Sequence, residues 1–156
     1  MFRIVIITNV FLCIFSSSVM ATNLGSGIFI PQVTIDGNTS DAIKIQAKES
    51  LFLTVYSVEE QRFQPLSIPF DVVSLSGSDL PYRLTLPTSI HECEISGEVG
   101  VEVKLNNAEW SQEGSEFNGA FDSHVMNLVY ESVPQQEDIS QSCFGTLKVQ
   151  VEVVGL

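Results

Sequence analysis

The sequence predicts an all-β protein built as an antiparallel β-sandwich of the immunoglobulin-like type. Several short runs of the chain have an apolar residue at every second position, which is the pattern of a half-buried strand. Gly, Ser, Asn and Pro separate these runs, and no stretch of useful length follows the helical period. A closed barrel is the alternative architecture, because it uses the same alternation and equally short turns.

The first 21 residues have the pattern of a secretory signal peptide. Arg3 supplies a positive charge, an apolar run follows over 4–15, and Val19 and Ala21 precede the expected cleavage site. The apolar run holds roughly a dozen residues, whereas a helix that crosses a bilayer needs about 20. We therefore expect cleavage after Ala21 and secretion of the chain that begins at Thr22.

The secreted part is long enough for one domain with a real core. We expect an N-terminal extension over residues 22–35 and a single domain over residues 36–156. The full chain has 19 acidic and 7 basic residues and a net charge of −12, which becomes −13 when Arg3 leaves with the signal peptide. This acidity disfavours an anionic membrane surface, and we expect no nucleic-acid partner.

Seven stretches after residue 40 are predicted to be strands. They cover residues 42–47, 51–58, 66–75, 80–86, 99–105, 124–133 and 147–153. The stretch 51–58 is apolar at consecutive positions, as a central strand of a sandwich can be. Pro69 indicates an edge strand or a bulge, because proline cannot donate to a ladder. The polar stretch 106–123 is rich in Asn, Gly and Ser and is predicted to form loops.

Two cysteines, Cys93 and Cys143, remain after Cys13 leaves with the signal peptide. In an oxidising compartment a single remaining pair predicts one disulfide. A closed loop of about 50 residues would contribute roughly 4 kcal/mol by chain-entropy reasoning. The tetrad "HECE" at residues 91–94 contains metal-ligating residue types, but alternate side chains of a strand point in opposite directions. We expect no metal site there.

Nothing in the sequence indicates an enzyme or a cofactor. The two histidines, His91 and His124, lie far apart, and the chain has no nucleophile elbow, phosphate-binding loop or zinc-binding helix. Trp110 and Phe117 lie in the polar stretch, where they could stack on a sugar or anchor a protein partner. Alternatively, they fold back and cover an edge of the core.

The two ends of the secreted chain contain the remaining patterns that bear on function. Near the N-terminus, "GSGIFIPQVTIDGN" places Ile28, Ile30, Val33 and Ile35 after two glycines and before a turn. The C-terminal "FGTLKVQVEVVGL" is the most regular strand of the chain, and a terminal strand this regular must be paired within a sheet.

In these two features the chain resembles the subunits of chaperone-usher fimbriae. In that family an incomplete immunoglobulin-like sandwich lacks its last strand, and the N-terminal extension of a neighbour fills the gap by β-strand addition. The resemblance implies a structural fimbrial subunit (shaft, minor or tip) that supports adhesion. It also implies passage through the periplasm to the cell surface. The implied partners are other fimbrial subunits, a periplasmic chaperone, an outer-membrane usher and a host surface receptor.

The resemblance also assigns roles to residues. It implies that Ile28, Ile30, Val33 and Ile35 form the donor strand. The residues that would border the acceptor groove and contact a chaperone are Leu147, Val149, Val151, Val153 and Leu156. The alternative is a self-sufficient secreted module that binds a carbohydrate or protein through its loops. Pairing of residues 22–35 within their own domain would favour this module, whereas a projecting segment would favour the fimbrial subunit.

Overall fold

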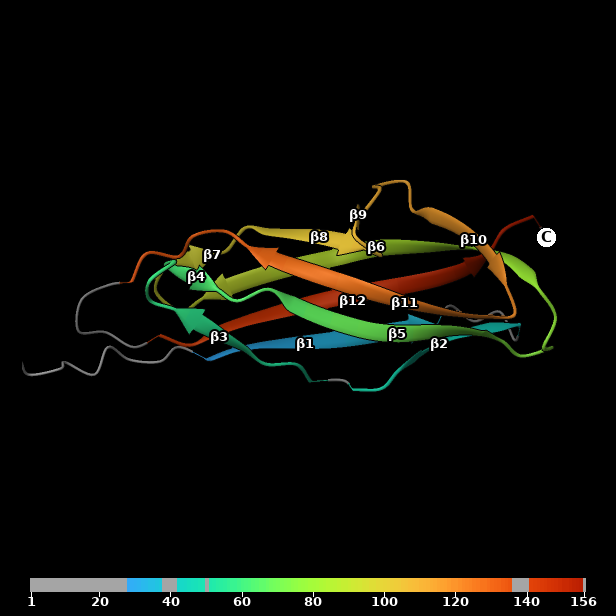
Figure 1. The fold of residues 1–156 in the computed structure, drawn as a ribbon, viewed down its shortest axis with the longest axis horizontal. Coiled ribbons are helices and arrows are strands. Elements are labelled where there is room, and N and C mark those ends of the chain that lie inside the picture. The colour runs from blue at the N-terminus through green and yellow to red at the C-terminus, as the bar shows by residue number, and fades with distance from the viewer. Residues whose placement is uncertain (1–27, 38–41, 50, 136–140, 156) are drawn as a thin grey trace, which may run out of the picture.

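The computed structural model describes residues 28–37, 42–49, 51–135 and 141–155, and for residues 28–37 it describes the backbone alone. These residues form two β-sheets that pack face to face and contain no helix (Figure 1). The predicted antiparallel β-sandwich is therefore confirmed. The signal peptide expected over residues 1–21 lies outside the described residues. In the described part of the chain, no helix is long and apolar enough to span a membrane.

Within the described residues, twelve strands make up the two sheets. The larger sheet contains β1 (Ile28–Gly37), β3 (Thr54–Ser57), β4 (Arg62–Phe63), β6 (Leu80–Cys93), β7 (Gly97–Glu98), β10 (Ser115–Gly119) and β12 (Cys143–Val153). The smaller sheet contains β2 (Ile43–Ala47), β5 (Leu66–Ser74), β8 (Val101–Leu105), β9 (Ala108–Glu109) and β11 (Phe121–Tyr130).

The order of strands places β12 in the middle of the larger sheet. That sheet runs β10-β6-β12-β1-β3-β4, with β7 paired to β6, and the smaller sheet runs β2-β5-β11-β8-β9. Neighbouring described strands are antiparallel except for β1 and β12, which are parallel. The C-terminal strand is thus paired within a sheet, as its regular alternation predicted, and it has a neighbour on both sides.

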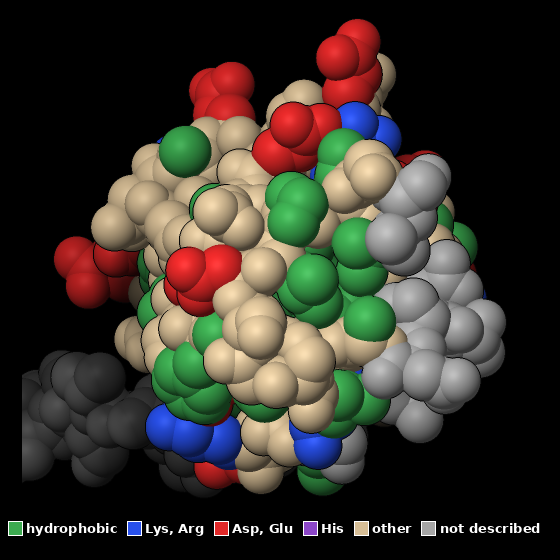
Figure 2. Space-filling model, turned by 90° about the vertical axis from the view of Figure 1, so that its right-hand side faces the viewer, with side chains coloured by type: hydrophobic (Ala, Val, Ile, Leu, Met, Phe, Trp, Pro, Cys, Tyr) green, Lys and Arg blue, Asp and Glu red, His purple; other side chains and the backbone are tan. Residues whose placement is uncertain are grey.

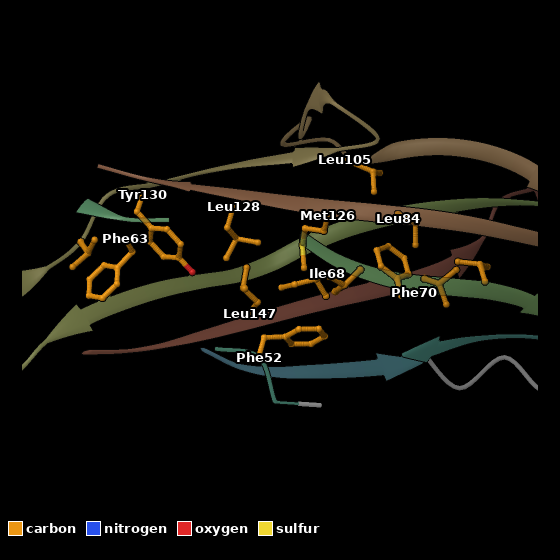
Figure 3. Close-up of a cluster of buried hydrophobic side chains, with 14 of the residues drawn as sticks. Phe52, Phe63, Ile68, Phe70, Leu84, Leu105, Met126, Leu128, Tyr130 and Leu147 are labelled. Atoms are coloured by element: carbon orange, nitrogen blue, oxygen red, sulfur yellow. The ribbon is translucent and has the colours of Figure 1, made fainter. Parts of the chain in front are cut away.

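The core lies between the sheets and is filled by the inward rows of four long strands (Figure 3). Alternate residues of these strands point to the same face, which places the apolar positions of each strand in one row. The rows consist of Ile68, Phe70 and Val72 from β5, Tyr82 and Leu84 from β6, Met126, Leu128 and Tyr130 from β11, and Leu147, Val149 and Val151 from β12.

The structure corrects two strand predictions. The stretch 51–58 is not buried on both faces as predicted, because only Thr54–Ser57 forms a strand, and Leu51, Leu53 and Val55 are exposed. Its continuous apolar character therefore does not reflect burial on both faces. The predicted loops over 106–123 contain β9 and β10, whose polar residues are held in strands by pairing with β8 and β6. Local propensity failed here because tertiary pairing overrides it.

Pro69 lies within β5, which is not an edge strand of its sheet. It pairs with Val125 of β11 on one side, but the ladder with β2 starts only at Phe70. On its other side Pro69 therefore has no partner strand among the described residues, and its missing N–H breaks no ladder hydrogen bond there.

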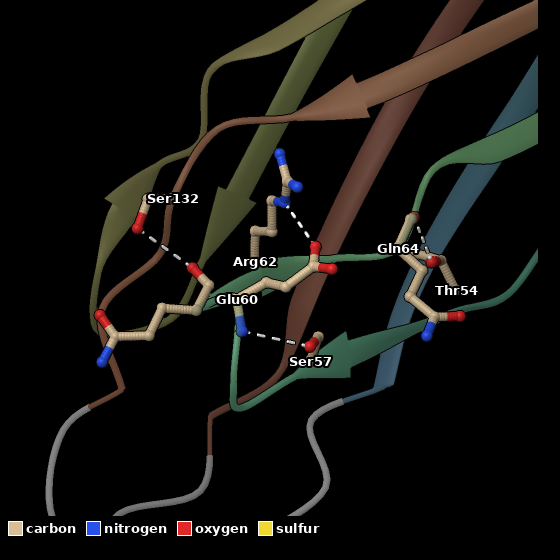
Figure 4. A network of polar contacts seen from close by, with 7 residues as sticks. Thr54, Ser57, Glu60, Arg62, Gln64 and Ser132 are labelled. Carbon is tan, nitrogen blue, oxygen red and sulfur yellow. Dashed lines mark hydrogen bonds and ion pairs between the residues drawn. The ribbon is translucent and has the colours of Figure 1, made fainter.

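The β3–β4 hairpin is anchored by polar contacts of its own (Figure 4). Within it, the Glu60 carboxylate pairs with Arg62 at 2.8 Å, and the Thr54 hydroxyl donates to the Gln64 carbonyl at 2.6 Å. The Ser132 hydroxyl donates to the Gln61 carbonyl at 3.1 Å, which ties the hairpin to the segment that follows β11. The Ser132 bond thus links the hairpin to the segment after β11 without using β1.

The end of the sandwich where β5 stops and β11 starts exposes apolar side chains. Leu75 and Phe121 are both more than half exposed. Figure 2 looks onto this end of the molecule and shows hydrophobic side chains gathered between polar and acidic ones. The Leu75 N–H donates to the Ala42 carbonyl, so β2 begins at this same end.

The predicted disulfide between Cys93 and Cys143 is present and buried. The two residues are direct cross-strand partners where β6 and β12 meet, and 50 residues separate them in sequence. The disulfide therefore joins β6 and β12, two neighbouring interior strands of the larger sheet, covalently.

We expect the double variant Cys93→Ala/Cys143→Ala to lower the free energy of unfolding by about 2–5 kcal/mol, because the bridge constrains the unfolded chain. Urea unfolding under non-reducing conditions measures this change. As a control, a reducing agent should lower the midpoint of the wild-type chain and leave that of the double variant unchanged. Equal midpoints for the two chains without reductant would contradict the expectation.

Candidate functional site

The candidate site is the strand position beside β12 that β1 occupies. Leu147, Val149 and Val151 of β12 are completely buried, while Thr146 and Glu152 on the opposite face are exposed. This alternation gives β12 one apolar face toward the core and one polar face toward solvent. Three of the predicted groove residues therefore form one continuous buried row along the strand.

The register of β1 against β12 runs without a shift from Phe29 opposite Cys143 to Gly37 opposite Val151. Val33 lies opposite Leu147 and Ile35 lies opposite Val149, so both occupy register positions beside the buried row.

The other two predicted donor residues occupy different register positions. Ile30 lies opposite Phe144, and Ile28 lies opposite Val55 of β3, and both of these partners are exposed. The four predicted donor residues thus divide between alternate positions of the strand, because 28 and 30 differ in parity from 33 and 35.

The far side of β1 is paired over a short length only. Ile28 and Phe29 pair with Val55 and Thr54 of β3, and no other described strand pairs with β1 on that side. β1 therefore takes most of its backbone pairing from β12.

One of the residues predicted to border the groove, Val153, lies beyond the end of β1. Val153 pairs with Tyr82 of β6 and is partly buried, but β1 ends two positions earlier, opposite Val151. Leu156, predicted to contact a chaperone, lies outside the described residues.

The structure does not bring Trp110 and Phe117 together into a ligand loop. Phe117 stacks on Tyr82 with ring centroids 5.6 Å apart and meets His124 edge-on at 4.6 Å, so it covers the core. Trp110 packs against a different part of the core, where it lines a shallow hollow with Leu86 and Val103. Both aromatic side chains are partly buried, and of the two Trp110 is the one that lines this hollow.

A polar network inside the sandwich was missed by the sequence reasoning. Tyr82 of β6 donates its hydroxyl hydrogen to Asp122 at 2.7 Å and lies 2.8 Å from Nε2 of His124. The other ring nitrogen of His124 lies 3.0 Å from the amide nitrogen of Asn106. A signal was available, because His124 shares the inward parity of Met126 and Leu128 in the strand predicted over 124–133.

Burial sets the protonation of these groups. Removal from water raises the pKa of Tyr82, and its hydrogen bond to Asp122 raises it further. Burial lowers the pKa of His124 more than the charges of Asp122 and Asp71 raise it. Both Tyr82 and His124 are therefore neutral near pH 7.

The "HECE" tetrad follows the predicted alternation. His91 and Cys93 are buried, whereas Glu92 and Glu94 are exposed on the other face, and Cys93 is bonded to Cys143. Over the described residues, no group of three His, Cys, Asp or Glu side chains is arranged to hold a metal ion.

Comparison with known proteins identifies no family. No family model matches the chain, and no curated protein sequence matches it. Among solved structures, the chain is similar to the CooA pilin subunit from enterotoxigenic Escherichia coli, at 8% sequence identity and a TM-score of 0.40. The match covers 79% of this chain and 96% of that one. A likeness at this level assigns no role to any residue.

The burial of His91 predicts a pH dependence of stability. Burial lowers its pKa to about 4 from an unfolded value near 6.5, so the unfolded chain takes up the proton first as the pH falls. His91 therefore does not lower the free energy of unfolding above about pH 6.5, but it lowers this free energy progressively as the pH falls toward 4. The loss amounts to about 3 kcal/mol.

Unfolding in urea at several pH values between 7.5 and 3.5 measures this loss. A His91→Gln variant keeps a side-chain nitrogen that can reach the Ser89 hydroxyl, which lies 3.1 Å from Nε2 of His91. We expect its free energy of unfolding to fall less steeply between pH 6.5 and 4 than that of the wild type. Parallel pH profiles for the two chains would show that His91 does not carry this dependence.

Proposed function

We propose that the chain is a structural subunit of a bacterial surface fimbria and that it assembles by exchange of its N-terminal strand. The pairing of β1 within its own chain favours the second candidate below, whereas the edge that β1 occupies carries this proposal. This strand pairs in parallel over nine positions with β12, beside the buried row of Leu147, Val149 and Val151. It is also the first described strand of the chain, so it can leave without unthreading any other strand.

The rest of the sandwich is held together independently of β1. The disulfide joins β12 to β6, and the β3–β4 hairpin is tied to Val133 by the Tyr56 hydroxyl at 2.6 Å. If β1 departs, β12 exposes an unpaired edge beside an apolar row, and such an edge attracts another strand. The N-terminal segment of a second subunit, carrying the same sequence, would satisfy that edge.

This proposal includes the secretion route and the partners. The expected signal peptide would carry the chain into the periplasm, where a chaperone would cover the β12 edge until an usher and a neighbouring subunit replace it. Support of adhesion, and contact with a host receptor, would follow from display of the assembled fimbria at the cell surface.

A second candidate function is a self-sufficient secreted binding module. The observation that favours it is that residues 28–35 pair within their own chain, in the strands β12 and β3. In this case β1 is a permanent strand, and the hollow beside Trp110 is the open surface for a ligand. The two candidates differ in whether β1 can move between molecules.

Peptide complementation tests whether the β1 position can be filled from outside. We expect a chain of residues 38–156 to be unstable alone and to be stabilised by a peptide of residues 26–37. A peptide carrying Val33→Asp and Ile35→Asp should bind roughly 100-fold more weakly, because it would place charges beside the buried row. The matched control carries Gln32→Asp and Thr34→Asp at the alternate positions and should bind nearly as well as the unmodified peptide. Differential scanning calorimetry measures the melting temperature of the chain 38–156 with and without each peptide.

Mixing experiments separate the two candidate functions. Mature chain 22–156 is incubated with an isotope-labelled chain 38–156, and native mass spectrometry follows the species formed. The fimbrial proposal expects complexes that contain both chains, because the mature chain donates β1 to the truncated acceptor. A mature chain that stays monomeric at every concentration, beside an unfilled acceptor, would overturn strand exchange and support the binding module.

A further inference from the structure

Both ends of one surface segment meet at a single buried histidine. The segment of residues 106–119, which we call the flap, contains the β8–β9 turn, β9, the loop with Trp110, and β10. At its start, the amide nitrogen of Asn106 lies 3.0 Å from Nδ1 of His124. Near its end, the ring of Phe117 packs edge-on against the His124 ring at 4.6 Å.

The hydrogen bonds around His124 form a chain in which each donor meets an acceptor. The Tyr82 hydroxyl donates to Asp122, which leaves the Tyr82 oxygen to accept from Nε2–H of His124. The Val125 N–H donates to Oδ1 of Asn106 at 3.0 Å, which fixes the Asn106 amide with its NH₂ group toward Nδ1. Each polar atom in this chain is satisfied when His124 is neutral and carries its proton on Nε2.

A second proton on His124 conflicts with this arrangement. Protonated Nδ1 would be a donor facing the NH₂ group of Asn106, which is also a donor. Rotation of the amide would relieve that conflict but would turn the NH₂ group toward the Val125 N–H. In the first orientation the part-buried Nδ1–H has no acceptor, which costs about 1–3 kcal/mol. In the second orientation the Val125 N–H loses its acceptor at an exposed position.

The charged groups around His124 are few. Asp122 on its own strand and Asp71 on β5 are the charges that act on it, and both favour the protonated ring. Phe70 of β5 stacks on the imidazole at 5.5 Å, while Tyr82 and Phe117 close its other sides. Burial among these rings lowers the pKa of His124, and the two carboxylates offset part of that effect.

We propose that His124 is an acid-sensitive latch, which holds the flap closed when neutral and releases the Asn106 end when protonated. The flap also approaches β6 closely, because a Cβ on Gly114 would lie 2.7 Å from the Leu84 carbonyl oxygen. The β10–β6 ladder and the exposed Arg83–Glu116 ion pair remain after protonation, so release begins at the turn. Trp110, Ser111 and Gln112 move with the flap, and the hollow that they line changes shape. The latch does not depend on the proposed fimbrial function.

Hydrogen exchange at pH 7.5 and 4.5, corrected for intrinsic rates, tests the latch in the mature chain. We expect amide protection in residues 107–113 to fall roughly tenfold or more at pH 4.5, relative to amides of β12. The Asn106→Asp variant offers carboxylate oxygens to both Nδ1–H of protonated His124 and the Val125 N–H. This variant should keep the flap protected at pH 4.5, and its His124 should titrate about one pH unit or more higher in an NMR titration.

The matched control is Asn107→Asp. Asn107 is the other residue of the same turn, also has a positive φ, and uses Oδ1 to accept from Asn127. It therefore receives the same charge change one residue away from the histidine, and it should open in acid like the wild type. Equal loss of protection in all three chains would overturn the latch. So would protonation of His124 in the wild type without any change in the flap.

Discussion

The apolar row of β12 needs a strand on each side of it, and the rest of the fold is arranged around that requirement. Leu147, Val149 and Val151 lie fully buried in the middle of the larger sheet. A strand in this position has backbone donors and acceptors on both edges, and each buried group left unpaired is costly. One edge is satisfied by β6 within a stapled, antiparallel ladder, and the other by β1.

The two neighbours of β12 differ in how firmly they are attached. β6 shares a disulfide and a long ladder with β12 and belongs to the middle of the chain. β1 comes from the N-terminal side and shares only two paired positions with its other neighbour, β3. The sandwich therefore has a permanent part and one strand that another molecule could replace, and this division is the physical basis of the proposed assembly.

The polar network at His124 has the same requirement as β12, namely that each buried donor meets an acceptor. Inside an apolar core a hydrogen-bond chain is stable when every donor meets an acceptor, and a single added proton upsets the whole chain. Tyr82, Asp122 and Asn106 meet this condition with a neutral imidazole. A buried histidine that is satisfied in one protonation state gives the flap its predicted sensitivity to acid.

Sequence reasoning succeeded where local pattern and burial coincide, as in β12, β8 and the first half of β6. It failed for 51–58, where a continuous apolar run is largely exposed, and for β9 and β10, whose polar residues carry no strand signal. It also missed the site at His124, because a lone histidine on an apolar face does not reveal its partners. Those partners lie on β5, on β6 and in the flap.

The sequence by itself determined the all-β class, the cysteine pair available for a disulfide, and the apolar face of the C-terminal strand. These follow from residue type and a period of two, which are local properties. Only the tertiary structure decided that β1 lies parallel to β12, and that Val33 and Ile35, rather than Ile28 and Ile30, lie opposite residues of the buried row in the register. Orientation and register depend on which backbone edges remain free after the other strands have paired, and no local pattern records that.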